Sequence, residues 1–280
     1  MKAIPFIKMQ GIGNDLVLID ARKLGRLNWP ALARQMSDRH FGIGSDGLLI
    51  VGPSRTADAR MRMFNPDGSE DFCGNGVRCV GIYLYEYGSV RKEALELETL
   101  AGRKTLHVHG SGGHARSVTV NMGVPVFEPK RLPTLIRREP IVAYPLRIGG
   151  CTFKLTCLSM GTPHAVIFGR ELPADDLFFS VSPKIESHRL FPERISVMWA
   201  KLESKRRIRI RIWERAVGES FACGTGACAT LVAAKLQNLA GPVASVVSRG
   251  GTLRIRWDGD VLKTGPARVV FNGIWPRRHS

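Results

Sequence analysis

The sequence predicts an α+β protein made of two similar halves, and three observations lead to this prediction. Most of the chain alternates apolar and polar residues in short runs that end at Gly, Pro and Asp turns, a pattern typical of β-strands. The few helical stretches do not alternate regularly with these runs, which disfavours a doubly wound α/β fold. A segment around Cys73 resembles a second segment around Cys223, 150 residues further along the chain.

Each element is predicted from periodicity and from the residues that end it. Period-two runs bounded by turn residues predict strands over residues 6–9, 16–20, 47–51, 59–64, 105–108, 117–122, 153–158, 165–168, 194–201, 208–213, 253–257 and 268–271. Turns over residues 11–15 and 65–68 separate neighbouring strands. Helices are predicted over residues 29–36, 77–87, 183–187 and 227–239.

The composition fits a folded protein without membrane segments. The chain has 280 residues, of which 44% are hydrophobic, enough for one large domain or two of ordinary size. Residues 1–6 do not begin an apolar signal region, and no apolar run approaches the roughly 18 residues that span a membrane. We expect a cytoplasmic protein. Its six cysteines should then be reduced, which favours core, metal-binding or catalytic roles over disulfides.

The formal net charge of +17 allows binding to nucleic acid, to an anionic surface or to an acidic small molecule. The densest basic run, residues 205–212, alternates with period two. It places Arg207, Arg209 and Arg211 on one strand face and isoleucines on the other. We interpret this run as a solvated face over a core face, with an anion-attracting surface as the alternative.

The internal repeat is the most informative feature of the chain. Residues 68–76 and residues 218–226 both contain Cys-Gly-x-Gly after an acidic residue and an aromatic residue, and both run directly into a helical stretch. The simplest explanation is two similar domains, each with a cysteine at the start of its own helix.

A cysteine at a helix N-terminus lies near unpaired N–H groups and the positive end of the helix dipole, which favours the thiolate. The neighbouring N–H groups are able to hold a carboxylate; they belong to Gly74, Asn75, Gly224 and Thr225. Two such ends around one anionic group would suit stereoinversion. One thiolate removes an α-proton, the opposite thiol delivers a proton to the other face, and the helix ends stabilise the enolate-like charge.

Three other interpretations of the cysteines compete with this one. Buried cysteine is common as a small apolar residue, but the occurrence of both cysteines in a Cys-Gly-x-Gly motif argues against this interpretation. Pairing Cys73 with Cys79 and Cys223 with Cys228 gives C-x5-C and C-x4-C, spacings that fit a zinc knuckle poorly. A disulfide between Cys73 and Cys223 would inactivate the protein rather than stabilise it. Cys151 and Cys157 have no surrounding motif and are predicted to be core.

These motifs resemble the diaminopimelate epimerase family, and the resemblance covers most of the chain. The matching segments are residues 8–15, 62–70, 73–79, 160–164, 213–215, 218–219, 223–227 and 264–267. The resemblance implies two pseudo-symmetric α+β domains, each a mostly antiparallel sheet wrapped around a central helix, with the site in the cleft between them. The expected domains are residues 1–121, joined by the returning segment 267–280, and residues 122–266.

The resemblance also implies an activity. The expected reaction is inversion of one α-carbon of L,L-diaminopimelate to the meso form, for lysine and peptidoglycan synthesis, with no pyridoxal phosphate and no metal. The protein is expected to be a homodimer with a small-molecule amino-acid substrate and no membrane partner. Cys73 and Cys223 are the expected acid/base residues. The expected substrate-binding residues are Asn14, Asn65, Gly74, Asn75, Thr162, Ser196, Glu214, Arg215, Gly224 and Thr225. His164, which follows Gly161-Thr162-Pro163, is interpreted as structural.

Three positions depart from the usual family pattern. The family commonly has asparagine at the positions of Thr162 and Ser196, and glutamine at the position of Gly47. The first two normally contact the far end of the substrate. A racemase of another amino acid, such as histidine or another basic one, therefore stays open as an alternative. A third hypothesis, a basic nucleic-acid-binding protein on this fold, has only the net charge in its favour, because no nucleic-acid-binding signature is present.

Overall fold

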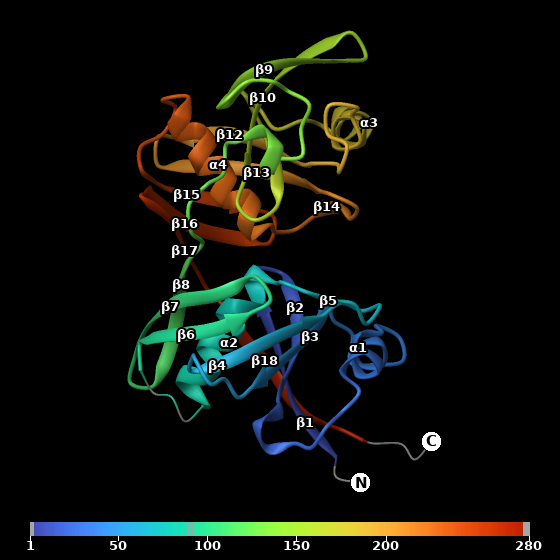
Figure 1. The fold of residues 1–280 in the computed structure, drawn as a ribbon, viewed down its shortest axis with the longest axis vertical. Helices are drawn as coiled ribbons and strands as arrows, with labels where there is room; N and C mark the ends of the chain where they lie inside the picture. Colours follow the sequence, from blue (N-terminus) through green and yellow to red (C-terminus); the bar gives the residue numbers. More distant parts are fainter. Residues whose placement is uncertain (1–2, 89, 91, 277–280) are drawn as a thin grey trace. The chain divides into compact units, whose positions relative to one another are not determined.

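The computed structural model describes residues 3–88, 90 and 92–276 (Figure 1). Contacts divide the chain into two compact units, Met1–Asn121 with Thr264–Ser280, and Met122–Lys263. Strand β17 (Asp260–Gly265) spans the second boundary between the units. Strands predominate over helices in both units, and the predicted α+β class is confirmed.

The first unit is one sheet with two α-helices. Its strands are β1 (Ile4–Gly11), β2 (Asn14–Asp20), β3 (Gly47–Gly52), β4 (Ala59–Phe64), β5 (Glu70–Asp71), β6 (Ala94–Thr99), β7 (Gly102–Ser111), β8 (His114–Asn121) and β18 (Arg268–Trp275). Its helices are the 3₁₀ turn η1 (Ala21–Lys23), α1 (Trp29–Ser37) and α2 (Gly74–Glu86). The strand order is β18-β1-β2-β3-β4-β6-β7-β8, with β5 also paired to β4.

The second unit repeats this plan. Its strands are β9 (Ile141–Ile148), β10 (Cys151–Ser159), β11 (Pro163–Gly169), β12 (Ser196–Ser204), β13 (Arg207–Glu214), β14 (Gly218–Ser220), β15 (Val243–Ser248) and β16 (Gly251–Asp258). Its helices are the 3₁₀ turn η2 (Pro129–Arg131), α3 (Asp175–Glu186) and α4 (Gly224–Leu236). The strand order is β9-β10-β11-β12-β13-β15-β16, with β14 also paired to β13.

Both sheets are mixed, and the parallel pairs occupy corresponding places. The parallel pairs are β2–β3 and β4–β6 in the first unit, and β11–β12 and β13–β15 in the second. A parallel connection requires a crossover. The crossovers are α1 and α2 in one unit and α3 and α4 in the other. The repeated cysteine segments therefore stand at the same point of the same topology, before the second crossover helix.

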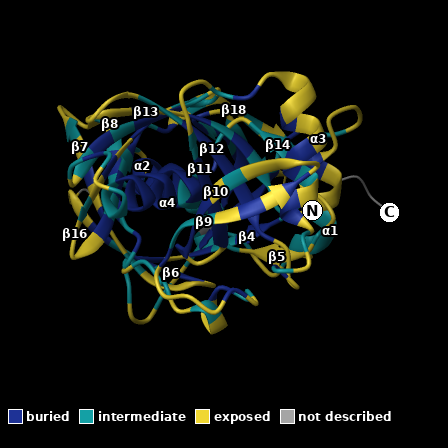
Figure 2. Cartoon of the chain, turned by 90° about the horizontal axis from the view of Figure 1, so that it is seen from above, coloured by how far each residue is buried: buried dark blue, intermediate teal, exposed yellow. Residues whose placement is uncertain are grey.

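The second crossover helix is the centre of each unit. Helix α2 packs against β1, β2, β3, β4, β7 and β8, and α4 packs against β10, β11, β12, β13, β15 and β16. Every residue from Asn75 to Leu84, and every residue from Gly226 to Ala234, is buried (Figure 2). A helix without a polar face is stable only when it is enclosed. Each sheet thus wraps around a helix that begins at a cysteine.

The first crossover helix covers the other face of each sheet. Buried residues of α1, including Ala33 and Met36, pack against Val17, Ile19 and Leu48 of β2 and β3. Phe178 and Ile185 of α3 join the corresponding cluster in the second unit.

The predicted helix over residues 183–187 is wrong in extent. Helix α3 begins after Ala174 and carries Asp175 and Asp176 in its first turn, where carboxylates favour the helix dipole. Pro183 lies in its last turn, where the missing N–H removes one backbone hydrogen bond of the helix.

Several other boundaries also need correction. Helices α2 and α4 begin three residues before the predicted starts at 77 and 227, because Gly74 and Gly224 are already helical. The predicted strand over 194–201 begins only at Ser196, because Arg194 has φ 62° and belongs to a turn. Strands β5, β6, β9, β14, β15 and β17 were not predicted. No helix among the residues in the described ranges is long and apolar enough to cross a membrane.

Gly47 begins β3, and the packing there leaves no space for a side chain. A Cβ atom on Gly47 would lie 2.8 Å from the backbone oxygen of Phe64 and 2.6 Å from Cε of Met63. Gly52, at the other end of the same strand, would place a Cβ 4.0 Å from the nearest atom, the oxygen of Arg60. The tight packing between β3 and β4 therefore excludes a side chain at position 47, where the family usually has glutamine.

We expect Gly47→Ala to lower the free energy of unfolding by about 1–3 kcal/mol, because the new methyl overpacks the strand pair. Gly52→Ala is the matched control and should change it by about 0.5 kcal/mol or less. Urea unfolding of the three proteins would measure both effects. Equal stability of the two variants would contradict the packing argument.

Candidate active site

Cys73 and Cys223 are the N-cap residues of α2 and α4. Their backbone angles are nearly identical, φ −120° and ψ 106° for Cys73 and φ −124° and ψ 112° for Cys223. Each Sγ accepts a hydrogen bond from the N–H three residues later, Gly76 and Gly226 respectively, at 3.3 Å in both cases. Both sulfurs therefore lie at the positive end of a buried helix, where negative charge on sulfur is stabilised.

The last glycine of each Cys-Gly-x-Gly frame lets the start of the helix approach a strand. A Cβ on Gly76 would lie 2.7 Å from Leu49 of β3. A Cβ on Gly226 would lie 2.5 Å from Sδ of Met198 of β12 and 3.2 Å from the Cys223 sulfur. A larger residue would displace the sulfur or separate helix and strand, which explains why this position is glycine in both repeats.

The first turn of each central helix presents N–H groups beside the cysteine, and groups at this position have no acceptor within the helix itself. The first two helical residues are Gly74 and Asn75 in α2, and Gly224 and Thr225 in α4. The Asn75 side chain is buried, and its Oδ1 atom has no hydrogen-bond partner among the residues that the structure describes. A buried polar atom without a partner is costly, so this acceptor suits a ligand donor such as an ammonium group.

In the first unit, Asn14 lies beside the Cys73 sulfur. Its Oδ1 atom is 3.6 Å from Cys73 Sγ, and its Nδ2 donates to Asp46 at 2.9 Å. Asp46 also accepts a hydrogen bond from Arg39 at 2.9 Å. Because Asp46 takes the N–H end of the Asn14 amide, the oxygen end faces the sulfur. Asn14 therefore offers Cys73 an acceptor.

Asn65 follows β4 and is held by its own turn. Its backbone N–H donates to the Ser69 carbonyl at 2.8 Å, and its side-chain Nδ2 donates to Ser69 Oγ at 3.0 Å. The local fold therefore fixes its orientation. Both of these hydrogen bonds lie within the turn that follows β4.

In the second unit, a row of side chains leads away from the Cys223 sulfur. Thr225 Oγ1 lies 3.4 Å from the sulfur, Thr162 Oγ1 lies 3.2 Å from Thr225 Oγ1, and His164 Nε2 lies 3.0 Å from Thr162 Oγ1. His164 is completely buried. Burial, assisted by the positive charge of Arg215, lowers the pKa of His164 to about 3, so its ring is neutral at ordinary pH.

Three further predicted residues meet at the ends of β12 and β13. Ser196 Oγ accepts a hydrogen bond from the Arg215 backbone N–H at 3.1 Å, and the Arg215 guanidinium donates to the Glu193 carbonyl at 3.1 Å. Glu214 acts on Cys223: burial raises the pKa of the Cys223 thiol, and the negative charge of Glu214 raises it further. Hydrogen bonds from Thr225 and from the Gly226 N–H act in the opposite direction. A ligand that neutralises Glu214 would weaken the contribution of this carboxylate, which holds the proton on sulfur through its charge and through a side-chain hydrogen bond.

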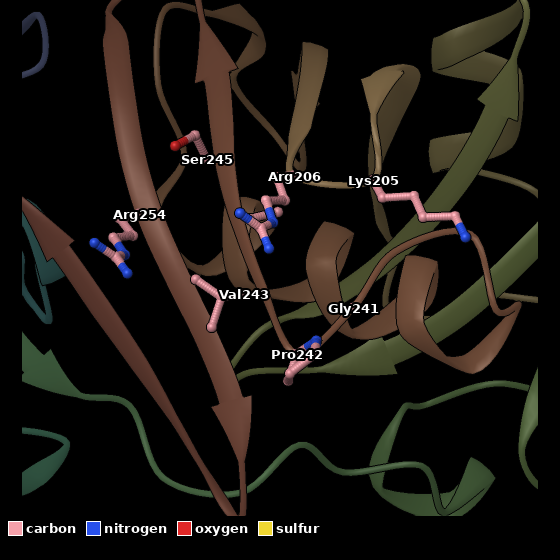
Figure 3. A pocket seen from close by; sticks show the side chains of 8 residues that line it. Lys205, Arg206, Gly241, Pro242, Val243, Ser245 and Arg254 are labelled. Atoms are coloured by element: carbon pink, nitrogen blue, oxygen red, sulfur yellow. The ribbon is translucent and has the colours of Figure 1, made fainter.

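No group of three or more His, Cys, Asp or Glu side chains within residues 3–88, 90 and 92–276 is placed to hold a metal ion. A separate hollow of about 620 Å³ lies elsewhere in the second unit (Figure 3). It combines the apolar Pro242 and Val243 with the basic Lys205, Arg206 and Arg254. None of the predicted site residues lines it.

A sequence profile described as diaminopimelate epimerase matches residues 6–128 and 156–270. A diaminopimelate epimerase of Desulfovibrio desulfuricans is 46% identical, over 97% of this chain and 98% of that protein. One of Acetivibrio thermocellus is 43% identical, over 96% and 97%. The chain belongs to the diaminopimelate epimerase family.

The fold extends beyond this family. The crystal structure of a hydroxyproline epimerase from Agrobacterium vitis, with bound trans-4-hydroxy-L-proline, matches with a TM-score of 0.71 and 16% identity. It covers 98% of this chain and 92% of that one. Identity this low establishes a shared fold, and the diaminopimelate epimerase assignment rests on the full-length sequence relatives.

In this diaminopimelate epimerase family member, sequence patterns did not predict that Asp46 and His164 lie near the cysteines. Asp46, which orients Asn14, stood out only as a neighbour of Gly47. His164 was interpreted as structural, although it connects to Cys223 through two hydroxyls. The usable signal was its spacing from Thr162: two residues apart at the start of a strand places both side chains on one face.

Proposed function

We propose that this protein inverts one α-carbon of L,L-diaminopimelate to give the meso isomer, with Cys73 and Cys223 as the two proton-transfer residues. Family membership supports the reaction. The observation that carries the mechanism is the matched pair of N-cap thiols, each 3.3 Å from a helix N–H. One thiolate accepts the α-proton, the other thiol donates its proton to the opposite face of the carbanion, and the two cysteines exchange protonation states.

Each residue group has a role in this proposal. The first-turn N–H groups of α2 and α4 bind the α-carboxylate and stabilise the charge that develops on it. Asn75 accepts from the α-ammonium group. The two predicted halves, 1–121 with 267–280 and 122–266, contribute one thiol each.

The far end of the substrate carries a second amino-acid head group. Glu214 suits its ammonium group, and Arg215 suits its carboxylate because a guanidinium binds carboxylates bidentately. Asn65 is a further polar contact at this end. Ser196 accepts the Arg215 backbone N–H, so this shorter residue still supports the arginine. These retained groups favour diaminopimelate over a histidine or other basic amino acid.

Two further properties belong to the same proposal. The protein acts in the cytoplasm, where a reducing environment keeps both thiols available, and it functions as a homodimer. Neither the cytoplasmic location nor the homodimer explains the net charge of +17. Nucleic-acid binding is not part of the proposed function.

Proton NMR in deuterated water tests the function. We expect the reduced protein to exchange the α-proton of L,L-diaminopimelate for deuterium and to produce the meso isomer, while L-lysine and L-histidine stay unchanged. Exchange with L-histidine or L-lysine, and none with diaminopimelate, would replace the proposed substrate. No exchange with any of the three, with the thiols shown to be reduced, would reject the enzymatic proposal.

A further inference from the structure

The hollow of about 620 Å³ in the second unit combines apolar and cationic side chains, and it has no role in the proposed inversion (Figure 3). Its residues come from three neighbouring segments. These are the turn Lys205–Arg206 between β12 and β13, the start of β15 with Pro242 before it, and Arg254 of β16. A concave site of this size suits a small molecule. We refer to it as the basic hollow; the residues that matter below are Lys205, Arg206, Pro242, Val243, Ser245 and Arg254.

The register of the sheet explains why these residues lie together. Strand β15 lies between β13 and β16, and Ser245 of β15 is paired with Arg207 on one side and with Arg254 on the other. Paired residues on adjacent strands share a face of the sheet. Both chain neighbours of Ser245 are buried, so Ser245 and Arg254 belong to the outer face. The Arg206 carbonyl accepts the Ser245 N–H at 2.9 Å, which holds the turn against β15.

The three cations of the basic hollow are not ion-paired with any carboxylate in the described part of the chain. Carboxylates on the flanking segments already have other partners. Glu203, beside the turn, pairs with Arg207 and with Arg209, at 2.6 Å in each case. Asp258, at the end of β16, pairs with Arg256 at 3.4 Å. Positive charges that surround one hollow without a counter-charge attract an anion to it.

The chemistry of the lining indicates which anion fits. A phosphate ester carries up to two negative charges near neutral pH, and guanidinium groups bind its oxygens bidentately. Arg206 and Arg254 supply two guanidinium groups, and the Ser245 hydroxyl supplies a further donor. Pro242 and Val243 offer apolar surface to the rest of the ligand. Diaminopimelate does not fit this site, because the cations would repel its two ammonium groups.

The distribution of charge favours a small ligand over a nucleic acid. A nucleic acid binds along a continuous basic stripe. On this face, the arginines next to the hollow are neutralised by their own carboxylates: Arg207 and Arg209 by Glu203, and Arg256 by Asp258. The unpaired positive charge is therefore confined to the hollow.

We propose that the basic hollow binds a small organic phosphate, with Arg206 and Arg254 on the phosphate and with Pro242 and Val243 against the apolar part of the ligand. The site is separate from the candidate active site. It assigns the anion-attracting role to the turn Lys205–Arg206 rather than to the alternating arginines that follow this turn.

Isothermal titration calorimetry with ADP, pyrophosphate and adenosine, in metal-free buffer without diaminopimelate, tests the proposal. ADP combines phosphates with a flat ring of low polarity. We expect ADP to bind with a Kd of about 0.1–1 mM. Pyrophosphate, which lacks the ring, should bind about fivefold more weakly or worse. Adenosine, which lacks the phosphates, should not bind detectably.

A matched pair of double variants locates the site. Arg206→Gln with Arg254→Gln removes two positive charges from the basic hollow and should weaken ADP binding by about tenfold or more. Arg60→Gln with Arg103→Gln removes the same charge from exposed positions of the first unit and should leave the Kd for ADP within about twofold. The urea unfolding curve of each variant would show that the fold is intact.

Four results would overturn the proposal. An unchanged Kd in the Arg206→Gln, Arg254→Gln variant would place ADP elsewhere, and equal losses in both double variants would reduce binding to attraction by the net charge. Pyrophosphate binding as tightly as ADP would leave the apolar lining without a role. Tighter binding of a thymidine oligonucleotide or of phosphatidylglycerol vesicles, lost when Arg206 and Arg254 are replaced, would make the site one for a nucleic acid or for a lipid surface. Because no arm uses diaminopimelate, none of these results bears on the proposed inversion.

Discussion

Replacing either Cys73 or Cys223 with alanine is expected to abolish inversion of diaminopimelate. Each thiol supplies one half of a proton transfer, and the loss of a positioned acid or base costs about 10²–10⁴-fold in rate. Neither variant retains the pair that the reaction requires, so both should fall to the detection limit of a coupled or NMR assay. Near wild-type turnover of either variant would make the two-thiol mechanism wrong.

Cys79→Ala and Cys228→Ala are the controls. Both residues lie in the same central helices as the N-cap cysteines and are completely buried. Both lie inside the helix rather than at its N-cap, and burial raises the pKa of the Cys79 thiol to about 12. These variants should lose some stability and little activity. Thermal unfolding of all four variants would separate loss of catalysis from loss of fold.

The centre of the site could be predicted from the sequence because the necessary signal is local. A cysteine followed by Gly-x-Gly at a helix start is a short pattern, and its repetition along the chain is enough to identify both copies. The Cys-Gly-x-Gly motif has the same local geometry in both copies. Cys73 and Cys223 have nearly the same φ and ψ, and each sulfur accepts a 3.3 Å hydrogen bond from a helix N–H.

The surroundings of the cysteines were less predictable because they depend on long-range pairing. Lys8 is a basic residue on β1, and it is buried against Asp15 and the Gly44 carbonyl. Asp46 reaches Asn14 only because β2 and β3 are parallel neighbours. Periodicity predicts which face a residue occupies but does not identify its partner on another strand.

Helix α3 shows a second limit. The predicted helix began at Pro183, close to where α3 in fact ends, although proline is tolerated at a first turn and usually breaks an interior. Packing of Phe178 and Ile185 into the core of the second unit outweighs the lost backbone hydrogen bond. Tertiary burial thus overrode a local signal that was correct as a general preference.

The second large effect that we expect is acid sensitivity caused by His164. Its pKa is about 3 in the folded protein and about 6.5 in an unfolded chain. Below pH 6.5 the unfolded chain binds a proton that the folded protein excludes, so the free energy of unfolding falls as the pH falls toward 3. The slope approaches about 1.4 kcal/mol per pH unit, which amounts to about 3 kcal/mol at pH 4.

Urea unfolding at pH 7 and pH 4 would measure this loss. Carboxylates with lowered pKa values, such as Asp20 and Glu186, also lose stabilisation in acid, so the comparison with a variant isolates the histidine. His164→Gln keeps a polar group that does not titrate, and the difference between pH 7 and pH 4 should shrink by about 3 kcal/mol. An unchanged pH dependence in His164→Gln would mean that the folded protein admits a charged ring at this position.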